Sequence, residues 1–175
     1  MIFNISCTFC VVAACAIGTT AVAQESSNRV AANTDWSVFT ETNPKECWAV
    51  SAPKETVNTK DGQTVTVRRG EILLMVFYRP GASVKGQVAF TGGYPFASGS
   101  TAGMDISGTK FELFTEDEWA WPATPEDDAK IVAAMKRGAD ATLTARSGRG
   151  TQTSDRFSLL GFTAAEEEAS KRCAG

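Results

Sequence analysis

Histidine is absent from the 175 residues of this chain. Because histidine is the commonest general base and a frequent transition-metal ligand, its absence removes the usual catalytic triads and most zinc or copper sites. The acidic clusters at residues 116–118 and 126–128 lack the alternating register of a calcium-binding loop. We therefore expect no catalytic residues, no metal and no cofactor, and predict that the protein is not an enzyme.

An excess of positive charge is also missing. The chain has 17 Lys and Arg against 20 Asp and Glu, which gives a net charge of −3 and a pI near 5.1. A nucleic-acid partner therefore has no general electrostatic support. Hydrophobic residues make up 43% of the chain and charged residues 21%, a composition typical of a globular protein with room for one domain.

Charged residues are lacking throughout residues 1–23, which contain an apolar run at 10–17 and end with small residues at Ala21 and Ala23. This pattern predicts a secretory signal peptide cut after Ala23, with the mature protein periplasmic or secreted. The apolar run is too short for a stable transmembrane helix. A second pattern around Cys15 resembles a lipoprotein processing site but is less well formed, so we do not expect a lipid anchor there.

The predicted cleavage divides the mature chain into two parts. Residues 24–34 are polar and small, and we expect a flexible leader there. Residues 35–175 are expected to form a single domain. Only two of the five cysteines remain after cleavage, Cys47 and Cys173. Two cysteines in an exported protein most simply form one disulfide, and they lack the C-x-x-C spacing of a redox pair.

The sequence of the domain consists mainly of short strand-like segments separated by glycine and proline turns. This pattern predicts an antiparallel β-sandwich or barrel. Residues 64–68 alternate like a half-buried strand, and the apolar run at 72–78 predicts a core strand. Two helices interrupt this rhythm. Thr124 is expected to cap a helix that Gly138 stops, and Thr163 to cap a shorter helix that runs to Cys173, with Glu166 completing the capping box.

The mature chain, from about Trp36 to Cys173, resembles the invasion-associated locus B family of exported Gram-negative proteins. The resemblance rests on residues 135–138, 147–151 and 155–165 with Cys173, and Trp36, Cys47 and the segments 93–96 and 111–121 fit the same pattern. It implies an immunoglobulin-like antiparallel β-sandwich in the cell envelope, associated by name with host-cell invasion. The family supplies no catalytic residues to carry over.

Two groups of residues are candidates for recognition. In the glycine-rich stretch 146–151, backbone N–H groups with Arg146 and Arg149 would suit an anion, and Asp155 lies close by in the sequence. The alternative is that this stretch is a structural hairpin turn whose arginines are solvated and bind no ligand. Aromatic side chains, Tyr94, Trp119 and Trp121 among them, would suit a glycan or protein surface, or simply pack in the core.

Two functional hypotheses follow. The first is a non-enzymatic envelope protein that acts by binding a protein or another envelope component. The partner would be an unidentified protein of the envelope or of a host cell, and the binding would then serve host-cell interaction. A contiguous exposed aromatic patch would support it. The second is a periplasmic small-anion binder or hydrolase that uses the loop from Arg146 to Thr151, which a pocket beside Arg149 and Asp155 would favour.

Overall fold

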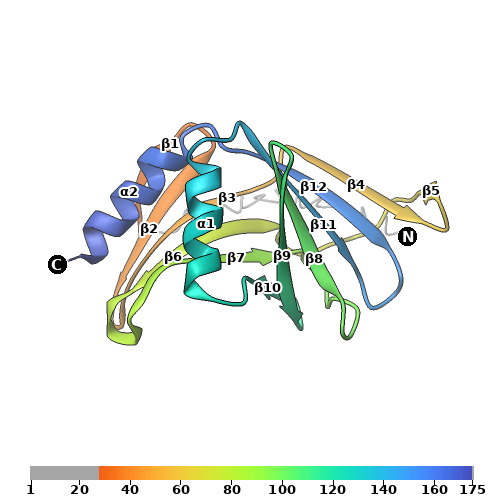
Figure 1. Cartoon of the computed structure of the whole chain (residues 1–175), viewed down its shortest axis with the longest axis horizontal. Helices are drawn as coiled ribbons and strands as arrows, with labels where there is room; N and C mark the ends of the chain where they lie inside the picture. The colour runs from red at the N-terminus through yellow and green to blue at the C-terminus, as the bar shows by residue number, and fades with distance from the viewer. Residues whose placement is uncertain (1–27, 175) are drawn as a thin grey trace, which may run out of the picture.

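Antiparallel hydrogen bonding joins the strands of residues 28–174, which are the residues that this computed structural model describes, into one twelve-stranded sheet. The predicted signal peptide, Cys15 and the start of the leader lie outside the described residues. The elements are β1 (Arg29–Asn33), β2 (Trp36–Thr42), β3 (Lys45–Ser51), β4 (Glu55–Lys60), β5 (Gln63–Thr64), β6 (Leu73–Arg79), η1 (Pro80–Ala82), β7 (Val84–Thr91), β8 (Thr101–Ile106), β9 (Thr109–Glu116), β10 (Trp119–Trp121), α1 (Pro125–Met135), β11 (Asp140–Arg146), β12 (Gln152–Ser158) and α2 (Phe162–Cys173). The spatial order is β1-β2-β3-β6-β7-β10-β9-β8-β11-β12-β4-β5 (Figure 1).

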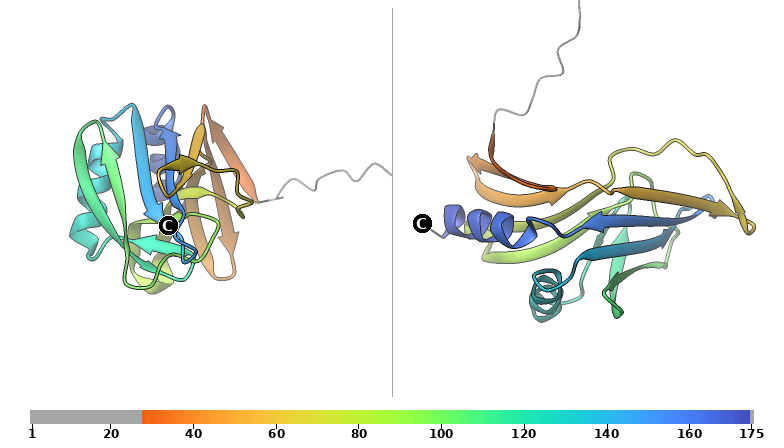
Figure 2. Two further views of the ribbon diagram at one scale, coloured as in Figure 1. Left: turned by 90° about the vertical axis from the view of Figure 1, so that its right-hand side faces the viewer. Right: turned by 90° about the horizontal axis from the view of Figure 1, so that it is seen from above.

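The sheet curls so that its first half, β1 to β7 in spatial order, faces its second half, β8 to β5 (Figure 2). Across the interior, the rings of Phe90 and Phe157 lie edge to face, 6.2 Å apart. The indole N–H of Trp36 donates to the carbonyl of Ser158 at 3.0 Å. The mainly β, antiparallel class with one mid-chain and one C-terminal helix is confirmed. The two layers of the expected sandwich, however, are halves of one continuous sheet joined through β10 and β9, whereas an immunoglobulin sandwich has two separate sheets.

Helix α1 begins where the sequence predicts. The Thr124 hydroxyl accepts from the Asp127 N–H at 3.2 Å and donates to its carboxylate at 2.8 Å. Strand β10 is short and pairs with β7 only near Phe90 and Thr91. Beyond it, the buried Asp128 of α1 accepts from the Val88 N–H of β7 at 2.7 Å. The helix thus satisfies a strand donor that a longer β10 would otherwise bond.

Helix α2 lies beneath β1 and β2 (Figure 2), and the ring of Phe162 meets that of Trp36 edge to face at 4.8 Å. The predicted cap at Thr163 is wrong, because the helix already begins at Phe162 after Gly161, whose φ of 89° suits glycine. Glu166 is buried, accepts from the Tyr78 hydroxyl at 2.5 Å and pairs with Lys136 at 2.6 Å. Neither helix of the described chain is long and apolar enough to cross a membrane.

The predicted disulfide joins Cys47 of β3 to Cys173 at the end of α2. Both cysteines are buried, with Cα atoms 5.9 Å apart. The two cysteines are 126 positions apart in the chain. The bond therefore ties the C-terminal end of α2 to β3, near the start of the domain, and holds α2 inside the curve of the sheet.

Two expectations about local structure are corrected. Residues 29–33 form β1, paired with β2, so the predicted flexible leader is wrong for that stretch; Ala31 and Val30 pack against the core. Residues 65–72, here named the crossing segment, belong to no strand. Their alternating pattern predicts a strand for 64–68, but β5 ends at Thr64, and the chain runs from β5 to β6 without forming a further strand.

Removal of the disulfide is expected to lower the melting temperature markedly. In the loop-closure account a cross-link over so long a loop is worth about 4–5 kcal/mol, less any native-state strain. Thermal unfolding with and without reductant should show this loss for the natural protein. The double variant Cys47→Ala, Cys173→Ala should melt at the lower temperature in both conditions. Superimposable curves for the natural protein in the two conditions would contradict the role assigned to the bond.

Neutralising Asp128 is expected to stabilise the protein near neutral pH. Burial raises the pKa of this carboxyl from 3.8 to about 6. The folded protein therefore binds a proton at Asp128 more tightly than the unfolded chain does. The stabilisation that this proton gives is complete below about pH 4 and is lost as the pH rises through about 6. Asp128→Asn keeps an oxygen for the Val88 N–H, so its unfolding free energy should exceed that of the natural protein by roughly 1–2 kcal/mol at pH 7 and not at pH 4. A difference that is independent of pH would contradict this assignment.

Candidate functional site

A row of aromatic side chains lies on the outer, convex side of the sheet. Strand alternation sends Val38, Ala49 and Val76 inward, and their neighbours point outward. The outward set, here named the outer aromatic face, consists of Phe39, Trp48, Phe77, Phe114, Trp119 and Trp121. The buried residues of both helices belong to the core inside the curve, so no described helix covers this face.

The side chains of the outer aromatic face contact one another across strands. Phe39 stacks on Trp48 at 5.7 Å between ring centroids, and Trp48 meets Phe77 at 6.2 Å. Trp119 and Trp121 are stacked at 6.4 Å. Phe114, opposite Trp121, is 56% exposed and the others are half-buried. Mutual packing of this kind gives a rigid apolar surface that loses little side-chain entropy when a partner covers it.

A groove lies at the end of the molecule where the crossing segment passes over the sheet. Its volume is about 660 Å³. Three segments line it, residues 67–69 of the crossing segment, the loop 93–95 after β7 and the turn between β11 and β12, together with Glu118. We name it the arginine groove, after Arg68, Arg69 and Arg149, which come from two of its walls.

Arg69 anchors the crossing segment. Its guanidinium makes two bonds to the Asp155 carboxylate of β12, at 2.7 and 2.6 Å, and donates to the carbonyl of Gly92 at 2.8 Å. The Arg69 side chain is 5% exposed and that of Asp155 0%. The guanidinium also lies 5.0 Å from the centre of the Tyr94 ring. Charge, hydrogen bonds and stacking together fix this arginine, so its charge is used inside the protein.

The turn between β11 and β12 uses most of its own backbone donors. The N–H groups of Gly150 and Thr151 bond to Ser147, at 2.8 and 3.1 Å, and that of Gly148 bonds to the carbonyl of Pro95 at 3.0 Å. These donors face the protein, so they do not form the anion cradle that the glycine-rich sequence suggests. What the turn offers to a ligand is the side chain of Arg149.

The structure separates the candidate residues into four places. Tyr94 and Arg149 line the arginine groove, whereas Arg146 is exposed and does not line it. Both oxygens of Asp155 are occupied, by Arg69 and by the Thr56 hydroxyl at 3.0 Å, which makes it an internal partner. Trp119 and Trp121 belong to the outer aromatic face.

Several residues of the arginine groove and of the outer aromatic face are not predicted from the sequence. Arg68 and Arg69 are missed, although two basic residues directly before a glycine and a buried run were a visible signal. The aromatic members on β2, β3 and β6 are missed because their proximity depends on strand register. Phe96, an aromatic residue of the segment 93–96 that the sequence offered as a surface candidate, lies instead in the core at 7% exposure.

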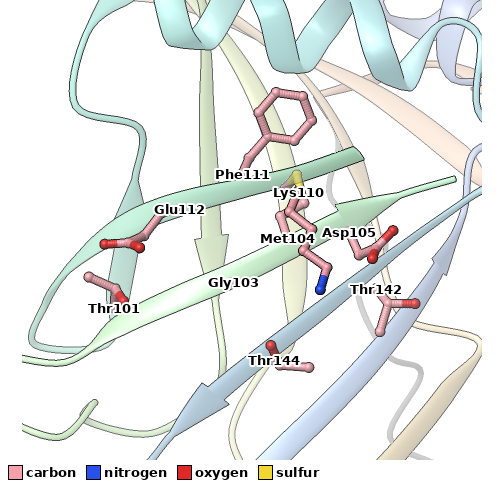
Figure 3. Close-up of a pocket in the computed structure, with 9 residues that line it drawn as sticks. All are labelled: Thr101, Gly103, Met104, Asp105, Lys110, Phe111, Glu112, Thr142 and Thr144. Carbon is pink, nitrogen blue, oxygen red and sulfur yellow. The ribbon is translucent and has the colours of Figure 1, made fainter. Parts of the chain in front are cut away.

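A second hollow, also about 660 Å³, lies on the polar part of the outer side (Figure 3). Gly103 lacks a side chain there, between Glu112 and Thr144 on the neighbouring strands. Figure 3 shows Lys110 and Thr144 on this side and Phe111 pointing the opposite way, toward α1. The hollow mixes one lysine with two carboxylates, and the described residues contain no cluster of three metal-ligating side chains. We therefore do not assign a ligand-binding site to this hollow.

The comparisons with known proteins give one finding. The model of the family described as invasion associated locus B (IalB) protein matches residues 36–170, which is most of the chain. It confirms the resemblance seen in the sequence. No curated protein and no solved structure matches the chain.

The Arg69–Asp155 pair is expected to show strong coupling. Arg69→Met or Asp155→Leu alone leaves one buried charge without its partner and should lower the free energy of unfolding by about 3–5 kcal/mol. The double variant removes both charges and should cost less than the sum of the two single changes. Urea unfolding of the four proteins measures this. Additive losses would contradict the coupling.

Proposed function

Since the chain belongs to the invasion associated locus B family, we propose that it is an exported, non-enzymatic protein of the cell envelope that acts by binding. Its partner is a protein of the envelope or of a host cell, or another envelope component. The predicted signal peptide at residues 1–23 supports export. The disulfide between Cys47 and Cys173 also favours it, because such bonds persist in oxidising compartments.

The observation that carries this proposal is the outer aromatic face. Tryptophan is among the residues that dominate binding energy at protein interfaces, and phenylalanine is enriched there. Met75 and Ala89 lie on the same side of the sheet, between the aromatic side chains of β3 and β6 and those of β10, and both are buried. The exposed aromatic side chains therefore form two groups, one of Phe39, Trp48 and Phe77 and one of Phe114, Trp119 and Trp121, and are not a scatter of single residues.

The charged rim supports recognition of a protein. Arg79 lies 4.4 Å from the centre of the Phe77 ring and pairs with Glu46 at 3.3 Å. A cation over an aromatic ring at the border of an apolar patch is common at interfaces, where polar groups surround a dry centre.

We expect the variant Trp119→Ala, Trp121→Ala to lose the partner. The purified natural protein is crosslinked in envelope fractions and in host-cell extracts, and bound molecules are identified by mass spectrometry. Truncating two central aromatic residues of an interface commonly costs 2 kcal/mol or more each, roughly thirtyfold in affinity. A partner that is captured by the natural protein should therefore disappear with this variant.

The matched control is Thr142→Ala, Thr144→Ala, on the polar part of the same outer side. This variant should capture the partner as the natural protein does, and all three proteins should melt at closely similar temperatures. Equal capture by the tryptophan variant, or no specific capture by the natural protein from either source, would contradict the proposed function.

A further inference from the structure

The backbone of the crossing segment is unusual in lacking hydrogen bonds where it borders the arginine groove. The Val65 N–H donates to the carbonyl of Asn58 at 2.9 Å, and the Gly70 N–H to that of Gly93 at 2.8 Å. Between these two points, no main-chain group of residues 66–68 bonds to another described residue. Thr66, Val67 and Arg68 are exposed. An extended segment with free donors and acceptors resembles the edge of a sheet, which pairs readily with another extended chain.

The segment is nevertheless held in place. Arg69 is bonded to Asp155 and to the carbonyl of Gly92 directly after the three free residues. Tyr94 lines the groove beside it and bonds through its hydroxyl to Thr153 at 2.5 Å. Since these contacts fix the backbone before any ligand arrives, little ordering cost remains for a chain that pairs with it.

The charge in the groove is unbalanced. Arg68 and Arg149 form no ion pair with any described residue, and they extend from different walls. The charge of Arg69 is matched by Asp155. Only one carboxylate, that of Glu118, lines the groove. The free positive charge therefore exceeds the negative charge, which favours a ligand with a carboxylate.

We propose that the arginine groove binds an extended peptide that carries an acidic side chain. The peptide adds main-chain hydrogen bonds to residues 66–68, and its carboxylate lies against Arg68 and Arg149. Val67, Pro95 and the Tyr94 ring contact its apolar side chains. This site shares no residue with the outer aromatic face, so the inference stands independently of the proposed function.

Selection from a random peptide library on the immobilised natural protein tests the proposal. Enriched sequences should contain Asp or Glu. The best peptide should bind Arg68→Gln, Arg149→Gln at least tenfold more weakly than the natural protein, because both charge-assisted bonds are lost. The matched control Arg146→Gln removes an exposed arginine from the same β11–β12 hairpin, outside the groove, and should leave the dissociation constant within about twofold.

Two further probes distinguish a peptide from a small anion. Methylation of alternate backbone nitrogens in the best peptide should weaken binding about tenfold or more, since it removes the donors that pair with the crossing segment. Free glutarate, which offers carboxylates without a backbone, should compete only at far higher concentration. The proposal is overturned if no acidic peptide is enriched, if the double arginine variant binds equally, if methylation has no effect, or if glutarate competes as well as the peptide.

Discussion

A carboxylate with no exposure to solvent requires a charged partner, and Asp155 finds one in Arg69, 86 positions earlier in the chain. This bidentate pair determines where the crossing segment lies. It holds the crossing segment against the middle of β12, while the same guanidinium donates to the carbonyl of Gly92, directly after β7. The two facing halves of the sheet are thereby joined through a segment that belongs to neither. The walls of the arginine groove depend on this bond.

The opposite end of the molecule is held by a different device. There the disulfide from Cys47 to Cys173 holds α2 inside the curve of the sheet, and Glu166 links that helix to Tyr78 and to Lys136 after α1. With the core closed at both ends, the outward positions of β2, β3, β6 and β10 contribute little to the interior. They can therefore carry the aromatic residues of the outer aromatic face without disturbing the core.

The sequence predicted the features whose causes are local or few in number. Thr124 was identified as a cap because its partner, Asp127, lies three residues away. The disulfide was identified because only two cysteines remain once a signal peptide is removed.

The features that were missed depend on contacts between distant segments. Asp155 was expected to face a ligand, since nothing near it in the sequence shows that Arg69 fills its site. The alternation at residues 64–68 favoured a strand, but alternation alone cannot show whether a neighbouring strand exists. Thr163 has the residues of a capping box, yet Glu166 is drawn into the core by Tyr78 and Lys136. The aromatic row needed the register of β2, β3 and β6, which no single strand reveals.

Amide hydrogen exchange of the Asp155→Asn variant, followed by NMR, tests most directly whether the Arg69–Asp155 pair controls this end of the fold. The two hydrogen-bonded amides of the crossing segment, those of Val65 and Gly70, report on it. The account predicts that both lose protection, because the segment opens locally without its anchor, while amides of β3 and α2 beside the disulfide keep theirs. Unchanged protection at Val65 and Gly70, or an equal loss throughout the protein, would contradict it.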